Sequence, residues 1–219
     1  MPMLASAVLW DLDGILIDTG PLHYAAWVDT LSSTGHAFAP ETFQSTFGMN
    51  NQGVLSVVLG REPTAAELRD LADRKEALFR ERIAGAVEPL PGVRQWLGRL
   101  QVAGWRQAVA SSAPAANIEV MVDAGGLRPF FDVLVSGEKM PGKPKPDVFL
   151  EAARQVGVPP AHCVVVEDAV AGVAAAKAAG MRCLAVTNTN PAERLAAADL
   201  IVNSLADLPA DAFERMLLM

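Results

Sequence analysis

The chain has 219 residues, of which 51% are hydrophobic, so it can bury the core of one large domain or of one domain that carries an insert. Its 18 Lys and Arg residues against 25 Asp and Glu residues give a net charge of -7, and no long run of like charge occurs, so nucleic acid is a poor candidate partner. Cys163 and Cys183 lie in apolar stretches, the start of the chain does not resemble a signal peptide and no apolar run is long enough to cross a bilayer, so we expect a cytoplasmic protein without a membrane partner.

The first predicted strand covers residues 7–11, an apolar run that ends at Asp11. Asp13 follows one residue later, and Gly14 after it lets the backbone turn sharply. Two carboxylates so close together repel each other unless a cation lies between them. A phosphoryl-transfer nucleophile needs this placement, and the pair suggests a metal and a substrate without establishing either.

A stretch much longer than one strand, helix and strand unit separates the first strand from the second. Its pattern is helical throughout, and helices are predicted over residues 21–33, 40–47, 53–59 and 65–84. Thr64 and Glu67 form a capping box at the start of the last of these helices. We therefore expect residues 17–87 to form a small helical cap domain over the mouth of the sheet, inserted between core segments 1–16 and 88–219.

After the insert, strand-like runs alternate with amphipathic helical patterns. The strands are predicted at residues 106–111, 131–136, 162–167, 182–187 and 199–202. The helices are predicted at residues 91–103, 114–124, 147–156 and 169–179. Regular alternation of this kind predicts an α/β fold with a parallel sheet covered on both faces. Such folds bind ligands outside the carboxyl ends of their strands.

Polar side chains follow three of these later strands. Ser111 and Ser112 come at the end of the second strand and just before a helix, where a hydroxyl and free N–H groups bind phosphate oxygens. Lys143 lies in a loop that prolines stiffen, and the fourth strand ends at Glu167 and Asp168. Taken singly, each of these residues has an ordinary reading as a helix cap, a turn residue or a solvated side chain.

The order of the motifs is more informative than any one of them. Asp-x-Asp-Gly, then Ser, then Gly-Lys-Pro-x-Pro-Asp, then Glu-Asp, each after its own strand, resembles the ordered motif set of the haloacid dehalogenase superfamily. The resemblance covers nearly the whole chain, and the sequence around Asp11 and Glu167 looks like the branch that holds β-phosphoglucomutase and the phosphoglycolate-type phosphatases. It implies a Rossmann-like parallel sheet core with an inserted all-helical cap.

The resemblance also implies a mechanism. Asp11 would attack phosphorus and carry the phosphoryl group as an aspartyl-phosphate. Asp13 would protonate the leaving alkoxide and then take a proton from the hydrolytic water. We expect the neighbouring carboxylates to raise the pKa of Asp13, which would help it to hold that proton.

The remaining motif residues would bind the phosphoryl group and a metal, by the same resemblance. Ser111, the N–H of Ser112 and Lys143 would hold the phosphoryl oxygens. The cofactor implied is Mg²⁺, since a divalent ion lets these carboxylates coexist with a phosphate. Its implied ligands are the carboxylate of Asp11, the backbone carbonyl of Asp13, the carboxylate of Asp168, and Glu167 through water or from behind the ligands.

The residues also bear on the class of reaction. Asp13 favours an oxygen leaving group, because dehalogenases displace halide without a proton and characteristically lack this aspartate, which leaves dehalogenase a weak third reading. In the mutases of this branch a cap lysine and arginine hold a second phosphate, and Phe47 and Asn51 stand at those positions here. No cation occurs at residues 114–116, where the mutases carry a core lysine. We therefore favour a phosphatase over a phosphomutase, with a non-catalytic phosphometabolite-binding protein as a weaker alternative.

Three cap residues are left with two readings each. His23 touches the substrate or Asp13, or is a hydrogen-bonded hinge residue. Trp27 belongs to the cap core, or stacks on a sugar face. Asn51 contacts a substrate hydroxyl, or is the N-cap of the helix that begins near Gly53. The predicted partner is one small phosphorylated metabolite, a sugar phosphate, a glycolate-like acid or a nucleotide, and we expect a monomer.

Overall fold

A six-stranded parallel sheet in the order β3-β2-β1-β4-β5-β6 forms the centre of the computed structural model, which describes residues 5–83 and 87–219. The strands are β1 (Ala7–Trp10), β2 (Arg106–Ser111), β3 (Val133–Ser136), β4 (Cys163–Glu167), β5 (Arg182–Val186) and β6 (Leu200–Val202). Every strand lies within its predicted span. The predicted α/β fold is confirmed.

Helices cover both faces of this sheet, as a parallel sheet requires. They are α5 (Val93–Val102), α6 (Ala115–Ala124), α7 (Asp147–Val156), α8 (Val170–Ala178) and α9 (Ala212–Leu218), and 3-10 turns lie at Arg128–Phe130, Pro160–His162, Ala192–Leu195 and Leu205–Asp207. Because strand side chains alternate, Val8 and Trp10 of β1 pack with α5, α6 and α9, whereas Ala7 and Leu9 pack with α7 and α8. The sequence patterns did not predict α9, whose Phe213 packs against Trp10.

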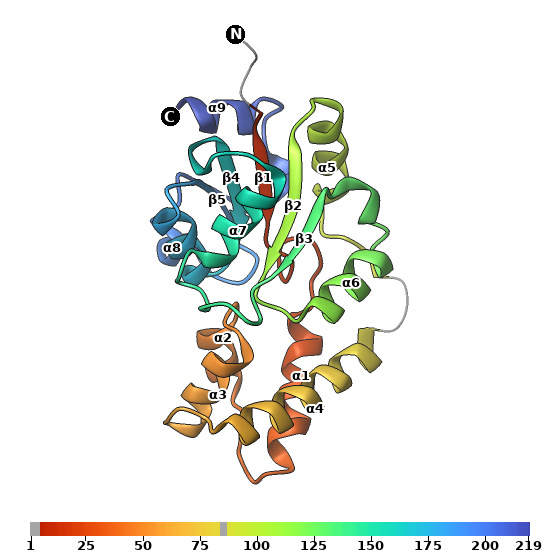
Figure 1. The fold of residues 1–219 in the computed structure, drawn as a ribbon, viewed down its shortest axis with the longest axis vertical. Helices are drawn as coiled ribbons and strands as arrows, with labels where there is room; N and C mark the ends of the chain where they lie inside the picture. Colours follow the sequence, from red (N-terminus) through yellow and green to blue (C-terminus); the bar gives the residue numbers. More distant parts are fainter. Residues whose placement is uncertain (1–4, 84–86) are drawn as a thin grey trace.

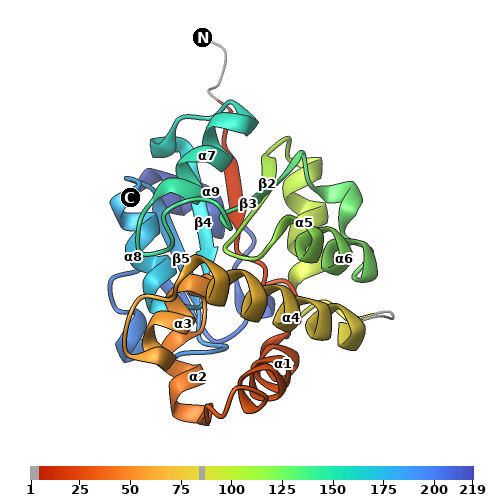
Figure 2. The same ribbon diagram turned by 60° about the horizontal axis from the view of Figure 1, so that its bottom comes forward.

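The predicted helical insert consists of α1 (Gly20–Ser32), α2 (Pro40–Thr46), α3 (Asn51–Leu59) and α4 (Ala65–Ile83). These helices form a cap at the end of the core where the strands terminate (Figures 1 and 2). Thr64 and Glu67 form the predicted capping box, since the N–H of each donates to the side chain of the other. The predicted helix end at Ala84 lies outside the described residues, and the domain limits at residues 17 and 87 stay a prediction.

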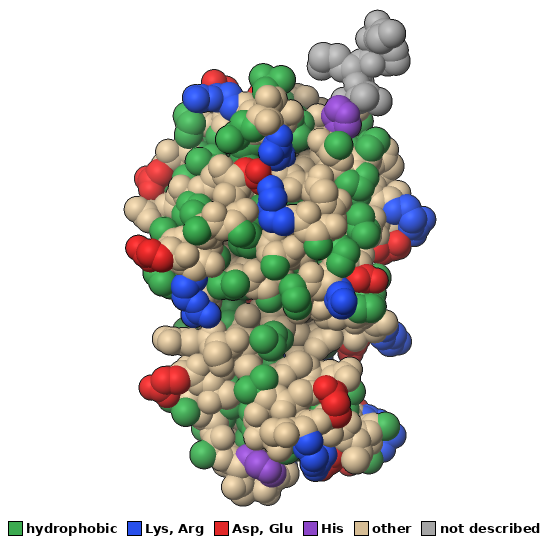
Figure 3. Space-filling view, turned by 90° about the vertical axis from the view of Figure 1, so that its left-hand side faces the viewer, with side chains coloured by type: hydrophobic (Ala, Val, Ile, Leu, Met, Phe, Trp, Pro, Cys, Tyr) green, Lys and Arg blue, Asp and Glu red, His purple; other side chains and the backbone are tan. Residues whose placement is uncertain are grey.

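The cap has an apolar cluster of its own and also joins the cluster of the core. Its own cluster contains Trp27, Leu31, Phe38, Val54 and Leu55. Phe79 and Ile83 of α4 belong instead to the cluster that packs on the sheet. No described helix is long and apolar enough to cross a membrane. On the face seen in Figure 3, basic and acidic side chains are interspersed, and the molecule narrows between core and cap.

The strand order places the end of β1 in the middle of the sheet edge that faces the cap. β1 pairs with β2 on one side and with β4 on the other, and the register sets Trp10 level with Val109 and Val166. Successive strands are added outward from this point in opposite directions, which opens a crevice at the carboxyl ends. Asp11 follows Trp10 directly, and its N–H donates to the carbonyl of Val166 at 3.0 Å. The fold thus presents Asp11 at the crevice.

Candidate active site

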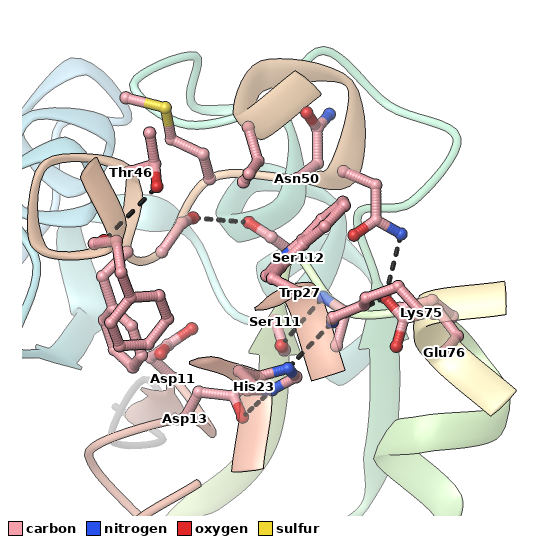
Figure 4. Close-up of a pocket in the computed structure, with 18 residues that line it drawn as sticks. Asp11, Asp13, His23, Trp27, Thr46, Asn50, Lys75, Glu76, Ser111 and Ser112 are labelled. Carbon is pink, nitrogen blue, oxygen red and sulfur yellow. Dashed lines mark hydrogen bonds and ion pairs between the residues drawn. The ribbon is translucent and has the colours of Figure 1, made fainter. Parts of the chain in front are cut away.

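The carboxyl ends of the central strands and the facing cap helices enclose one pocket (Figure 4). The core contributes the polar side chains of Asp11, Asp13, Ser111 and Ser112. The cap contributes a mixed set of aromatic, amide and charged side chains, among them His23, Trp27, Phe47, Asn51, Lys75 and Glu76. Six of the seven residues singled out as candidate catalytic or substrate-binding groups therefore line a single pocket, and the seventh, Lys143, donates a hydrogen bond to Asp11.

Lys143 joins two carboxylates at the strand ends. It lies between β3 and α7 and is only 5% exposed. Its Nζ is 2.6 Å from Oδ1 of Asp11 and 2.6 Å from Oε1 of Glu167. Burial alone would lower the pKa of Lys143, but the charges of these two carboxylates outweigh burial and raise it, so the ammonium keeps its proton.

Asp11 has the opposite balance. Burial raises the pKa of Asp11 to about 7, with Glu167 and Asp13 adding to the rise and Lys143 opposing it. Ionisation of Asp11 is therefore unfavourable at neutral pH in the absence of a further cation. Any group that brings more positive charge to this carboxylate will favour the ionised, nucleophilic form.

Three buried acids have the arrangement of a cation site. Asp11, Glu167 and Asp168 each offer a carboxylate oxygen, and these oxygens lie within 4.8 Å of one another. Oδ1 of Asp168 is buried and has no hydrogen-bond partner among the described residues. Burial and the charges of Glu167 and Asp11 raise the pKa of Asp168 well above its ordinary value. An orphaned carboxylate oxygen beside two further carboxylates fits a hard divalent cation such as Mg²⁺.

Two glycines lie where any larger side chain would overlap the carboxylates of Asp168 and Glu167. Gly14 has a φ of +80°, and a Cβ at this position would lie 2.1 Å from Oδ2 of Asp168. A Cβ on Gly172, in helix α8, would lie 1.7 Å from Oε1 of Glu167. The backbone around both carboxylates is therefore packed as closely as glycine permits.

Asp13 is held by Thr19 and His23. Thr19 Oγ1 donates to Oδ1 of Asp13, and His23 Nε2 lies 2.9 Å from the same oxygen. Lys75 Nζ lies 2.8 Å from Nδ1 of His23. A lysine ammonium only donates, so Nδ1 accepts and Nε2 carries the proton that it gives to Asp13. The predicted contact of His23 with Asp13 is present in this structure, and its contact with a substrate stays a prediction.

The expectation that neighbouring carboxylates raise the pKa of Asp13 is wrong. Burial does raise it, but the contacts with His23 and Thr19 and the charge of Lys75 together lower the pKa below its ordinary value. The reason is that Oδ1 of Asp13 accepts hydrogen bonds from Thr19 and His23, which stabilise the ionised form. Asp13 is accordingly a carboxylate in this arrangement.

The two serines face different partners. Ser111 Oγ accepts the N–H of Ala113 at 3.1 Å, which fixes the hydroxyl at the end of β2. Ser112 Oγ donates to the carbonyl of Gly48 at 3.2 Å and so links the core to the cap. Their predicted contacts with phosphoryl oxygens stay a prediction.

The structure excludes one of the two readings of Asn51, and the contact with a substrate hydroxyl stays a prediction. Helix α3 begins two residues earlier than predicted, and its N-cap is Asn50, which accepts the N–H of Gly53 at 2.9 Å. The N-cap reading of Asn51 is therefore wrong. Its Nδ2 instead donates to Oε1 of Glu76 at 2.9 Å inside the pocket. Trp27 is both cap core and pocket lining, with Lys75 Nζ 5.5 Å from its ring centroid.

Sequence reasoning assigned no role to several residues that complete the site. Thr189 donates to Asp168, and Asn190 donates to the backbone carbonyl of Asp168 at 3.0 Å. Both belong to the polar stretch that follows β5, and a polar run after a strand was the available signal. Lys75 and Glu76 gave no such signal, because adjacent opposite charges within a long helix are typical of a solvated face.

Known proteins resemble this chain in sequence and in fold. A family model described as a haloacid dehalogenase-like hydrolase matches residues 5–180. Protein SUPPRESSOR OF QUENCHING 1, chloroplastic, from Arabidopsis thaliana is 38% identical over 84% of this chain, although the match spans only 18% of that protein. Hexitol phosphatase B from Escherichia coli (strain K12) is 33% identical to this chain, and the alignment covers 95% of this chain and 96% of that protein. The crystal structure of β-phosphoglucomutase from Clostridium difficile superposes with a TM-score of 0.88 at 26% identity, over 98% of both chains.

Proposed function

Since this chain belongs to the haloacid dehalogenase-like hydrolase family and is a phosphoric monoester hydrolase of that family, we propose that it cleaves the monophosphate of a small sugar or sugar alcohol through an aspartyl-phosphate on Asp11. One observation carries this proposal: the Asp11 carboxylate faces the pocket at the end of the central strand and is paired with a buried lysine. The name of the hexitol phosphatase that aligns over nearly its whole length supports the substrate class.

In the proposed first step, an oxygen of Asp11 forms a bond to phosphorus and the bond from phosphorus to the leaving alkoxide breaks. In this proposal the ammonium of Lys143 compensates negative charge beside Asp11, and the hydroxyl of Ser111 and the N–H of Ser112 would donate to the phosphoryl oxygens. In the second step, water attacks the same phosphorus, phosphate leaves, and the carboxylate of Asp11 is restored.

Asp13 serves both steps in this proposal. It gives a proton to the leaving alkoxide and takes one from the attacking water. The contacts with Thr19 and His23 lower the pKa of Asp13, which suits the second step, in which a carboxylate must accept a proton. The first step requires the protonated form, so Asp13 must be protonated when substrate is bound.

A divalent cation is part of the proposal. Asp11, the carbonyl of Asp13 and Asp168 would hold Mg²⁺, with Glu167 acting through water or from behind the ligands. When bound, this ion would supply positive charge that lets the phosphoryl group approach the carboxylates. The unpartnered Oδ1 of Asp168 supports this assignment.

A β-phosphoglucomutase-type phosphomutase is the second candidate, because a solved enzyme of that name shares the fold over nearly the whole chain. Phe47 and Asn51 line the pocket at the aligned positions where mutases carry cations, which favours water as the acceptor. Phosphate release from a panel of sugar and sugar alcohol monophosphates tests the proposal. Conversion of β-glucose 1-phosphate, with its bisphosphate present, into glucose 6-phosphate without phosphate release would favour the mutase instead.

We also propose that the protein is cytoplasmic and monomeric. Cys163 and Cys183 are free and buried thiols, which is in keeping with a reducing compartment. Burial raises the pKa of the Cys163 thiol to about 12, so it is unreactive at neutral pH. Gel filtration of the purified protein tests the monomer.

A further inference from the structure

A buried carboxylate of the cap, Glu76, lines the pocket across from Asp11 (Figure 4). It belongs to α4 and is 5% exposed. Its Oε1 accepts hydrogen bonds from Asn51 Nδ2 and Lys75 Nζ, each at 2.9 Å. Its Oε2 accepts a hydrogen bond from Nδ2 of Asn117, which lies in core helix α6. Hydrogen-bond donors from two cap helices and from the core thus converge on the carboxylate of Glu76.

Glu76 is ionised. Burial would raise its pKa, but the charge and hydrogen bond of Lys75, together with the amide of Asn51, lower the pKa below the ordinary value. Arg80 Nη1 donates to Oδ1 of Asn117 at 2.9 Å, which orients the amide so that its N–H groups point to Glu76. A carboxylate held by three donors in a buried setting stays charged.

Glu76 also neutralises the positive charge of Lys75 in the pocket. Among the described residues that line the pocket, Lys75 is the single lysine or arginine. Its ammonium donates to Glu76 and contacts His23, so two of its three N–H groups are engaged. A second anionic group entering here would lie beside a carboxylate and find the nearby cation already paired. In a buried site that repulsion is only weakly screened.

A hydroxyl group meets the opposite situation. A carboxylate offers about four acceptor positions, and three are used in Glu76, so one remains for a donor. The hydroxyls of a sugar alcohol donate and carry no charge. The same carboxylate that would repel a second phosphate or carboxylate would therefore accept a hydrogen bond from a neutral polyol chain.

We infer that Glu76 is a specificity-determining residue, an inference that rests on the function proposed above. It restricts the substrate to monophosphates with a neutral, hydroxyl-bearing leaving group. Substrates that carry a second phosphate or a carboxylate are excluded. Specificity of this kind comes from a repulsive element as well as an attractive one. Asn51 and Asn117 are positioning residues in this arrangement, since they act through Glu76.

The test compares wild type, Glu76→Gln and the matched control Glu81→Gln, an exposed glutamate on the same helix. Three substrates are used: a hexitol monophosphate, a hexose bisphosphate and a phosphorylated sugar acid. Wild type is expected to prefer the hexitol monophosphate in kcat/KM. Glu76→Gln should narrow that preference about 10-fold, because a neutral amide replaces the repelling charge, and most of the change should appear in KM for the doubly anionic substrates. Glu81→Gln should leave the preference unchanged.

A folded Glu76→Gln enzyme with an unaltered preference, or with an equal loss on all three substrates, contradicts a role in specificity. If Glu76→Gln does not fold, the wild type decides: equal kcat/KM for the monophosphate and the bisphosphate overturns the inference, and a clear preference with tighter competitive inhibition by a hexitol than by the matching sugar acid sustains it. Absence of phosphate release from every monophosphate overturns the proposed function itself, and with it the inference.

Discussion

The ammonium of Lys143 lies 2.6 Å from Oδ1 of Asp11, although the two residues are separated by 132 positions in the chain. Asp11 is delivered by the central strand and Lys143 by the loop before α7, so the parallel sheet brings them together. The pair places the carboxylate that we propose as the nucleophile and a compensating cation beside the same pocket. This relationship has consequences for both activity and stability.

Replacing Lys143 by methionine should lower kcat by about 10²- to 10³-fold, because a positive charge that stabilises the transferring phosphoryl group is lost. The change also leaves Asp11 and Glu167 buried without their cation. Loss of one partner of a buried ion pair costs about 3–5 kcal/mol, so the variant should unfold at a lower temperature. Lys145→Met, at an exposed lysine two residues further on, is the control and should behave as wild type. An active Lys143→Met enzyme would remove this lysine from the mechanism.

Mg²⁺ should stabilise the folded protein through the acidic cluster. A ligand present at 100 times its dissociation constant adds about 2.7 kcal/mol to the free energy of unfolding. We expect Mg²⁺ to raise the melting temperature of wild type, EDTA to reverse the rise, and Asp168→Asn to abolish it, because Oδ1 of Asp168 is the buried oxygen without a partner. Thermal unfolding with and without Mg²⁺ measures this directly. An equal rise in Asp168→Asn would place the ion elsewhere.

Replacing Gly172 or Gly98 by alanine should have opposite effects on stability, although both glycines lie within helices. A Cβ on Gly172 would overlap Oε1 of Glu167 at 1.7 Å, whereas nothing lies within 4 Å of a Cβ on Gly98 in α5. Gly172→Ala should therefore destabilise the fold and displace Glu167. Gly98→Ala should stabilise it by up to about 1 kcal/mol, because alanine favours the helix. Denaturant unfolding of both variants, and Mg²⁺ binding of Gly172→Ala, provide the check; a stabilised Gly172→Ala protein is the outcome that conflicts with this packing.

Asp199 should stabilise the fold in a pH-dependent manner. Burial raises its pKa, but the hydrogen bonds from Lys177, the N–H of Cys183 and Arg182, with the charge of Lys177, lower the pKa overall. A folded pKa below the unfolded value of about 3.9 stabilises the protein fully above that pH, and the contribution fades as pH falls through the folded pKa.

Asp199→Asn should accordingly cost about 1–2 kcal/mol at pH 7 and clearly less near pH 3. Urea unfolding of wild type and variant at the two pH values gives the difference. Asp211→Asn, at an exposed aspartate whose nearest cation is 3.9 Å away, is the control and should show little change at either pH. An Asp199→Asn deficit that is the same at both pH values would contradict the charge-based explanation.

The sheet and the strand-end residues could be predicted because their signals are local. An apolar run that stops at Asp11 or Glu167 shows in the sequence both the strand and the polar group at its end. The predicted helices and strands agree with the structure to within two residues at the ends that the structure describes. Helix α9 was not predicted because it has only seven residues, too few for its buried Ala212, Phe213 and Met216 to establish a period.

The environment of the site could not be predicted in the same way. The pKa of Asp13 depends on Lys75 and His23, which come close only once the cap has folded onto the core. Glu76 carries no mark in the sequence that separates it from the exposed Glu81 on the same helix. Charges acquire their chemical role from burial and partners, and both are set by tertiary packing.

The most direct test of the central claim is to trap the phosphoryl group on Asp11. Enzyme with Mg²⁺ is mixed with a radiolabelled sugar alcohol monophosphate, quenched in acid within one turnover, and digested for peptide mapping. We predict a hydroxylamine-sensitive label on the peptide that contains Asp11, and neither label nor phosphate release in Asp11→Asn. Phosphate release by Asp11→Asn at the wild-type rate, or a label on another residue, would contradict the mechanism.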